Sequence, residues 1–128
     1  MAEFRSDHLH LRSTDPEGAA RFYSDMLGAK RTGEMMNGGA LRVMLNLGGL
    51  NLFLEEVPPG TPTTPKPPFV GIEHIGLAVT GFDAIVAELR ANGVVFVKEP
   101  SSPRPGVKIA FIQAPDGVHI EILERAAA

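Results

Sequence analysis

Ile109-Ala-Phe-Ile-Gln-Ala-Pro-Asp-Gly-Val-His-Ile-Glu-Ile-Leu123 is the stretch that decides the fold. Two runs of alternating apolar residues flank Pro115-Asp116-Gly117, three residue types that each favour a tight turn. This pattern predicts a β-hairpin. Because side chains alternate along a strand, Glu121 should point away from the face that carries Ile120 and Ile122. A mid-strand carboxylate is costly to bury without a partner, so Glu121 is expected to have one.

Composition excludes several kinds of protein. The 128 residues suffice for one small domain, or for two small halves that share a core. A net charge of -3 gives no electrostatic reason to expect nucleic acid or a membrane as partner. The N-terminus is charged and lacks the apolar run of a signal peptide, so a cytoplasmic location is expected. Without cysteine, any metal must be bound by His, carboxylate, amide or water ligands.

A structural pattern occurs twice along the chain. Asp7–Arg12 alternates like a strand, a helix start follows at Thr14–Glu17, and Gly28 suits the helix end. Three strand-like runs come next, and then the Pro-rich segment 57–68, which reads as a linker. Beyond the linker, Glu73–Ala78 repeats the first strand, and a shift of 66 positions places His8 on His74.

The second half continues like the first, with a helix over 83–90, a strand over 94–97 and the hairpin of 109–123. We therefore predict an α+β fold of two βαβββ modules, in which curved mixed sheets close a cup. One domain spans 1–128, with module 1 at about 5–56, the linker at 57–68 and module 2 at about 70–125.

The face of each sheet that is turned away from its helix should line the cup. By strand alternation this face carries the following polar and aromatic side chains: His8, His10, Arg12, Asn51, Phe53, Glu55, His74, His119 and Glu121. His8, His74 and Glu121 are the candidate metal ligands, because two imidazoles and one carboxylate suit a divalent ion and leave coordination positions open. One ion per site, Zn, Ni, Mn or Fe, is expected.

The remaining members of this face have more than one interpretation. His10 is either a substrate-facing group or a fourth ligand, and His119 follows the turn closely enough to lie at a solvated rim. Arg12 is either an exposed strand charge or the binding group for a substrate carboxylate or phosphate. Asn51 and Phe53 are further candidates for substrate contact.

The chain resembles the vicinal oxygen chelate superfamily, which includes glyoxalase I, extradiol dioxygenases, and the fosfomycin- and bleomycin-resistance proteins. The resemblance rests on three blocks, at 8–16 with 21–28, at 73–79 and at 110–123. It implies ligands at His8, His74 and Glu121, and in glyoxalase I an arginine at the position of Arg12 contacts glutathione. The family's fourth ligand, a carboxylate or Gln in glyoxalase I, matches Phe53, which cannot bind metal.

The leading hypothesis is a metal-dependent lyase or isomerase of the glyoxalase type. Its small substrate would chelate the ion through two neighbouring oxygens, and Glu55 or Glu121 would act as the base. The alternatives are an Fe(II) ring-cleaving dioxygenase and a fosfomycin- or bleomycin-resistance-type protein. The linker, at roughly 3.1 Å per residue, is long enough for a site shared between two chains, so a homodimer is expected.

Overall fold

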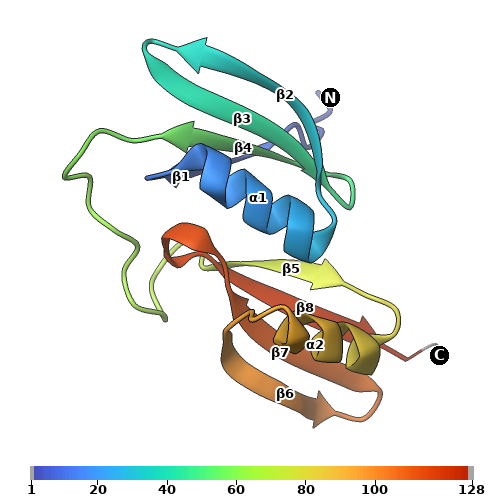
Figure 1. Ribbon diagram of the computed structural model, residues 1–128. Coiled ribbons are helices and arrows are strands. Elements are labelled where there is room, and N and C mark those ends of the chain that lie inside the picture. Colours follow the sequence, from blue (N-terminus) through green and yellow to red (C-terminus); the bar gives the residue numbers. More distant parts are fainter. Residues whose placement is uncertain (1, 127–128) are drawn as a thin grey trace. The chain divides into compact units, whose positions relative to one another are not determined.

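The computed structural model describes residues 2–126 and consists of two compact units, Met1–Pro62 and Thr63–Ala128 (Figure 1). Each unit has the order strand–helix–strand–strand–strand. The elements of unit 1 are β1 (Leu9–Ser13), α1 (Pro16–Leu27), β2 (Lys30–Asn37), β3 (Ala40–Leu47) and β4 (Leu50–Glu56). Those of unit 2 are β5 (His74–Ala78), α2 (Phe82–Ala91), β6 (Phe96–Arg104), β7 (Val107–Gln113), a 3-10 turn (Pro115–Gly117) and β8 (His119–Arg125).

Unit 1 is an open four-stranded sheet in the order β1-β4-β3-β2, with α1 packed on one face. β1 runs parallel to β4, and the other neighbouring strands are antiparallel. The helix begins where the Asp15 side chain accepts a hydrogen bond from the Gly18 amide at 3.1 Å, and it ends at Gly28 with φ 75°. Its buried face meets the apolar face of the sheet; the core consists of Ala19, Ala20, Tyr23, Val43, Leu45, Leu47, Leu52 and Leu54.

Unit 2 repeats this design in the order β5-β8-β7-β6, with β5 parallel to β8. The Glu124 carboxylate accepts hydrogen bonds from the amides of Gly81 (3.1 Å) and Phe82 (2.9 Å), and so caps the start of α2. The core is again aliphatic and aromatic: Ile75, Phe82, Val86, Leu89, Val107, Ala110, Ile112, Ile120 and Ile122. The predicted hairpin is confirmed as β7, the 3-10 turn and β8.

Two local features differ from what the sequence pattern predicts. A strand was expected over residues 94–97, but β6 extends to Arg104 and contains Pro100 and Pro103. β6 is an edge strand with three register shifts, and an edge tolerates residues that cannot donate to a ladder. The spacing of Thr14 and Glu17 suits a capping box, but the N-cap is Asp15, and the Glu17 carboxylate accepts two guanidinium hydrogen bonds from Arg31, at 2.7 and 2.9 Å.

The strand registers define which positions of the two units are equivalent. Leu9 pairs with Leu52 in unit 1, as Ile75 pairs with Ile120 in unit 2. Following the ladders from these pairs shows which positions are equivalent: His10 and Gly76, Arg12 and Ala78, Phe53 and Glu121, Glu55 and Leu123, and Arg42 and Ile109.

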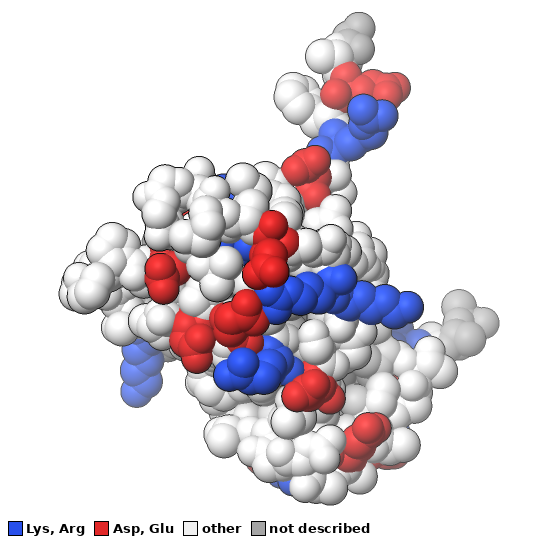
Figure 2. Space-filling model, turned by 45° about the horizontal axis from the view of Figure 1, so that its top comes forward, with Lys and Arg blue, Asp and Glu red and all other residues white. Residues whose placement is uncertain are grey.

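Among residues 2–126, neither helix is long and apolar enough to cross a lipid bilayer. On the face shown in Figure 2, acidic and basic side chains are interspersed rather than gathered by sign. This mixing matches the small net charge of the chain.

Candidate metal and substrate site

The open face of unit 2 brings His74 and Glu121 together. His74 begins β5, and Glu121 lies in the adjacent β8, opposite Gly76. His74 Nε2 is 3.3 Å from Glu121 Oε1, and the two side chains are 32% and 21% exposed. Two of the three predicted ligands therefore lie side by side, at a depth where a small ligand can reach both.

The open face of unit 1 holds the third predicted ligand against an aromatic ring. His8 stacks on Phe53, with ring centroids 4.1 Å apart and an interplanar angle of 12°. Phe53 and Glu121 occupy equivalent strand positions. Each histidine therefore contacts the same position of its own unit: His8 meets the Phe53 ring, and His74 meets the Glu121 carboxylate.

Both histidines are held by the acidic residue that precedes them. His8 Nδ1 is 2.6 Å from Asp7 Oδ2, and His74 Nδ1 is 3.1 Å from Glu73 Oε1. A carboxylate partner on Nδ1 fixes the ring and leaves Nε2 as the nitrogen that can bind a metal. The same device thus occurs independently in the two units.

These donors fit a divalent ion. Two neutral imidazoles and a carboxylate are borderline ligands that accept Zn, Ni, Mn or Fe, and His74 Nε2 already points at Glu121. Among residues 2–126, no three His, Asp or Glu side chains lie close enough together to hold an ion.

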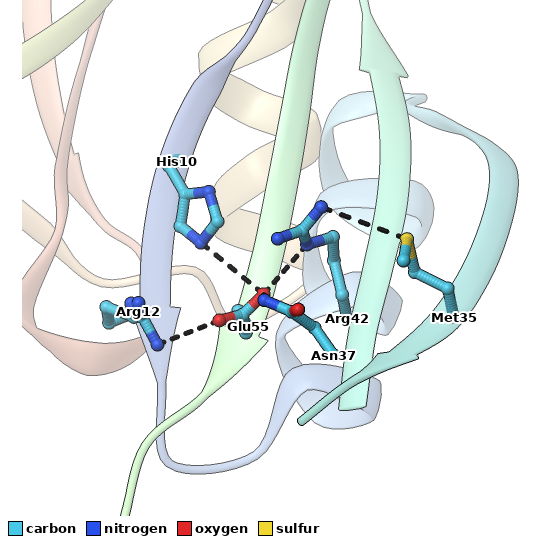
Figure 3. Close-up of polar contacts among 6 residues, drawn as sticks. All are labelled: His10, Arg12, Met35, Asn37, Arg42 and Glu55. Atoms are coloured by element: carbon cyan, nitrogen blue, oxygen red, sulfur yellow. Dashed lines mark hydrogen bonds and ion pairs between the residues drawn. The ribbon is translucent and has the colours of Figure 1, made fainter. Parts of the chain in front are cut away.

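Unit 1 contains a polar cluster around Glu55, which is only 3% exposed (Figure 3). Its Oε1 accepts hydrogen bonds from Arg42 Nε at 2.8 Å and from Asn37 Nδ2 at 3.2 Å, and its Oε2 is 2.9 Å from Arg12 Nη1. The hydrogen bond from Arg42 holds the pKa of Glu55 below its usual range, and Asn37 and Arg12 add to this against the effect of burial. Glu55 is therefore a persistent anion whose oxygens are already occupied.

His10 borders this cluster without joining it. Its Nε2 lies 3.7 Å from Glu55 Oε1, beyond hydrogen-bond distance, and is buried without a hydrogen-bond partner within residues 2–126. Burial lowers the pKa of His10; Glu55 opposes this effect, and the nearby Arg12 and Arg42 add to it. His10 is thus a neutral imidazole on the open face.

Asn51 has a structural role, because both ends of its side-chain amide are hydrogen-bonded within the protein. Its Nδ2 donates to the backbone carbonyl of Asp7 at 3.0 Å, and its Oδ1 accepts from Asn46 at 3.0 Å. It thereby holds the backbone just before His8. His119 lies opposite His74 in the ladder and is half-buried.

Sequence reasoning did not identify Arg42 or Asn37 as site residues. A signal existed, because Gly48 and Gly49 form a two-residue turn that pairs Leu47 with Leu50. Counting back along that register places Arg42 directly opposite Glu55. Predicting the contact of Asn37 would also require the register of the turn between β2 and β3, because Asn37 reaches Glu55 from β2, across β3.

The cluster should make stability depend on pH. A carboxyl group whose pKa is lowered by folding stabilises the protein above its unfolded pKa, and this contribution is lost as pH falls through the folded pKa. We expect the urea midpoint to fall on acidification below roughly pH 4.3, the ordinary pKa of glutamate. Glu55→Gln should start less stable at pH 7 and lose less on acidification. The exposed neighbour Glu56→Gln should keep the wild-type profile; equal acid sensitivity of Glu55→Gln and wild type would contradict the assignment.

Comparison with known proteins gives a consistent result. The family model for the glyoxalase/bleomycin resistance protein/dioxygenase superfamily matches residues 5–122. Among proteins of curated function, none matches the sequence significantly.

Several solved structures share the fold. A glyoxalase family protein from Enterococcus faecalis is 22% identical, with a TM-score of 0.80 over 94% of this chain and 97% of the other. A glyoxalase I from Leishmania major, described as trypanothione-dependent, is 25% identical, with a TM-score of 0.77 over 95% and 87%. A mutant of the fosfomycin resistance protein FosX from Listeria monocytogenes, complexed with Mn(II) and 1S,2S-dihydroxypropylphosphonic acid, is 18% identical, with a TM-score of 0.74 over 100% and 95%.

Proposed function

Since the chain belongs to the glyoxalase/bleomycin resistance protein/dioxygenase superfamily, we propose that it is a divalent-metal-dependent lyase or isomerase. Its substrate would be a small molecule with two neighbouring oxygens. The observation that carries the proposal is the contact between His74 Nε2 and Glu121 Oε1 at 3.3 Å, with Glu73 holding the other ring nitrogen. This is a pair of metal donors already oriented toward a common point.

The proposed ligands are His8, His74 and Glu121. A divalent ion bound there would supply Lewis-acid polarisation of a substrate carbonyl, which makes the proton on the neighbouring carbon easier to remove. The protein's part is to orient the two imidazoles through Asp7 and Glu73, and to provide a group that takes the proton.

We assign the proton transfer to Glu121 instead of Glu55. A general base needs free acceptor capacity and a pKa near the working pH. Both Glu55 oxygens are engaged by Arg42, Asn37 and Arg12, and its pKa is lowered by them. The contact between Glu121 and His74 is the looser one, so Glu121 is the carboxylate that is able to move a proton.

The experiment joins metal content to proton exchange. Protein purified without added metal should carry about one divalent ion per chain. In D2O, the metal-loaded protein should exchange the α-proton of α-hydroxyketones for deuterium. The exchange is measured as the loss of that proton's signal in NMR spectra. Chelated protein and the Glu121→Ala variant should not exchange it. Unchanged exchange in Glu121→Ala would end the proposal.

Phe53 favours a second candidate. Because it occupies the position equivalent to Glu121 and stacks on His8, it leaves a three-ligand layout, as in the dioxygenase and fosfomycin-resistance branches that the sequence resembles. Oxygen uptake on catechols by iron-loaded protein would support the ring-cleaving dioxygenase. The homodimer and the cytoplasmic location stay predictions.

A further inference from the structure

The charged cluster on unit 1 is not required by the fold. Unit 2 has the same strand order and pairing, yet the positions equivalent to Arg12, Arg42 and Glu55 are Ala78, Ile109 and Leu123. One architecture is therefore built once with an apolar trio and once with two arginines paired to a buried carboxylate. Burying charges is unfavourable unless they are paired, and an apolar trio at such positions is commonly as stable. A role in binding explains why unit 1 carries the charges.

The cluster has an excess of positive charge. Arg12 and Arg42 both pair with one carboxylate, Glu55, which leaves a net charge of one positive unit among the three groups. Arg42 is the better buried of the two arginines, with 19% of its side chain exposed against 58% for Arg12. A partly buried guanidinium with unbalanced charge favours an anionic ligand.

Arg42 is held so that part of its donor capacity stays unused. Its Nε donates to Glu55 at 2.8 Å, and Nη1 lies 3.8 Å from the Met35 sulfur, a weak acceptor. Nη2, with two of the five guanidinium N–H donors, has no hydrogen-bond partner in the part of the chain that is described, 2–126. Glu55 and Asn37 thus fix the direction of a fork that can still bind a ligand.

The fork lies near the candidate metal ligand of the same unit. The Arg42 guanidinium carbon is 5.3 Å from the centre of the Phe53 ring, and His8 stacks on that ring at 4.1 Å. One small molecule could therefore contact the site at His8 and extend to Arg42.

A cavity lies at the end of the sheet where β4 finishes and β3 begins. It has a volume of about 510 Å³ and is lined in part by Thr14, Ala40 and Val57. These residues lie two positions after Arg12, two before Arg42 and two after Glu55, respectively. Pockets of about 300–1,000 Å³ are typical for small ligands, so a space of suitable size is lined by residues close in sequence to the cluster.

We propose that Arg42 binds an anionic group of the substrate, a carboxylate or a phosphate-type group, and that Glu55 is the positioning residue that aims it. This inference rests on the proposed function, since it names the substrate class of the same site. It assigns to Glu55 a role in recognition instead of proton transfer.

The test is an NMR titration of metal-free, 15N-labelled protein with inorganic phosphate and, separately, with sodium acetate at constant ionic strength. Arg42 Nε–H, which is fixed by Glu55, should shift saturably in the millimolar range with at least one anion. The tighter of the two identifies the class, phosphate-type or carboxylate. Because no metal is present, a failed metal site would not affect the result. If neither anion shifted the Arg42 Nε–H signal, the proposal would be overturned. This result comes from the wild-type protein and does not depend on a variant that folds.

Variants add a second criterion. Arg42→Gln should weaken binding of the effective anion by at least about tenfold, and Arg42→Lys should recover part of it, because lysine keeps the charge but not the fork. Arg31→Gln is the matched control, since Arg31 is held by the carboxylates of Glu17 and Glu34 outside this cluster. Binding that is equally strong in Arg42→Gln and wild type would overturn the proposal.

Discussion

Replacing His74 by alanine should abolish stoichiometric metal binding, whereas replacing His119 should not. The two imidazoles make a matched pair, because they lie opposite each other on neighbouring strands and on the same face. Of these two, His74 is the one that approaches Glu121, at 3.3 Å, and the one whose Nδ1 is held by a preceding carboxylate among the described residues. Loss of one of three protein ligands should weaken the metal by at least about a hundredfold, which corresponds to about 2.7 kcal/mol.

Isothermal titration of chelated protein with Zn²⁺ and Ni²⁺ would measure this difference. Thermal unfolding gives an independent readout, since an ion that binds only the folded state raises the melting temperature. That shift should be present in wild type and in His119→Ala and absent in His74→Ala. If His119→Ala lost the metal and His74→Ala kept it, the ligand assignment on β5 would be wrong.

The strand pattern was sufficient to predict the fold. Alternation in 7–12, 73–78 and 109–123 defined which residues face the helices, and the shift of 66 residues revealed the two modules. When apolar residues alternate strictly along a strand, only one orientation of the strand buries all of them. These predictions therefore depended little on tertiary context. β6 was underestimated because Pro100 and Pro103 contradict a central strand, and only its place at a sheet edge admits them.

The contacts within the site were harder to predict from the sequence than the fold. Alternation placed Glu55 and Arg12 on the open face, but it did not pair Glu55 with Arg42 and Asn37, which come from two other strands and depend on the register of two turns. A glutamate on a cup face was therefore interpreted as a base, although Arg42 and Asn37 make it a fixed anion. Whether His8 completes the His74–Glu121 pair depends on the placement of the two units, which no local pattern encodes.

Replacing Phe53 by glutamate should convert a three-ligand site into a four-ligand site. Phe53 is the register equivalent of Glu121, and its ring lies 4.1 Å from His8, much as the Glu121 carboxylate lies near His74. A carboxylate at this position should therefore point at the metal from the side of unit 1. We expect metal affinity to rise by about tenfold, which corresponds to about 1.4 kcal/mol. The metal-free variant should unfold at a lower temperature, because the stacking on His8 is lost and a charge takes its place.

Phe53→Gln is the matched control, since glutamine has nearly the same shape as glutamate but no charge to offer the ion. Titration with the same metal would compare the two variants directly. Tighter binding by the glutamate variant alone would support a metal beside His8, reached from both units. Equal affinity in the two variants would mean that the position of Phe53 does not face the ion, and that the His74–Glu121 pair draws its third ligand from elsewhere. The two outcomes therefore decide whether the apolar ring is what limits this site to three protein ligands.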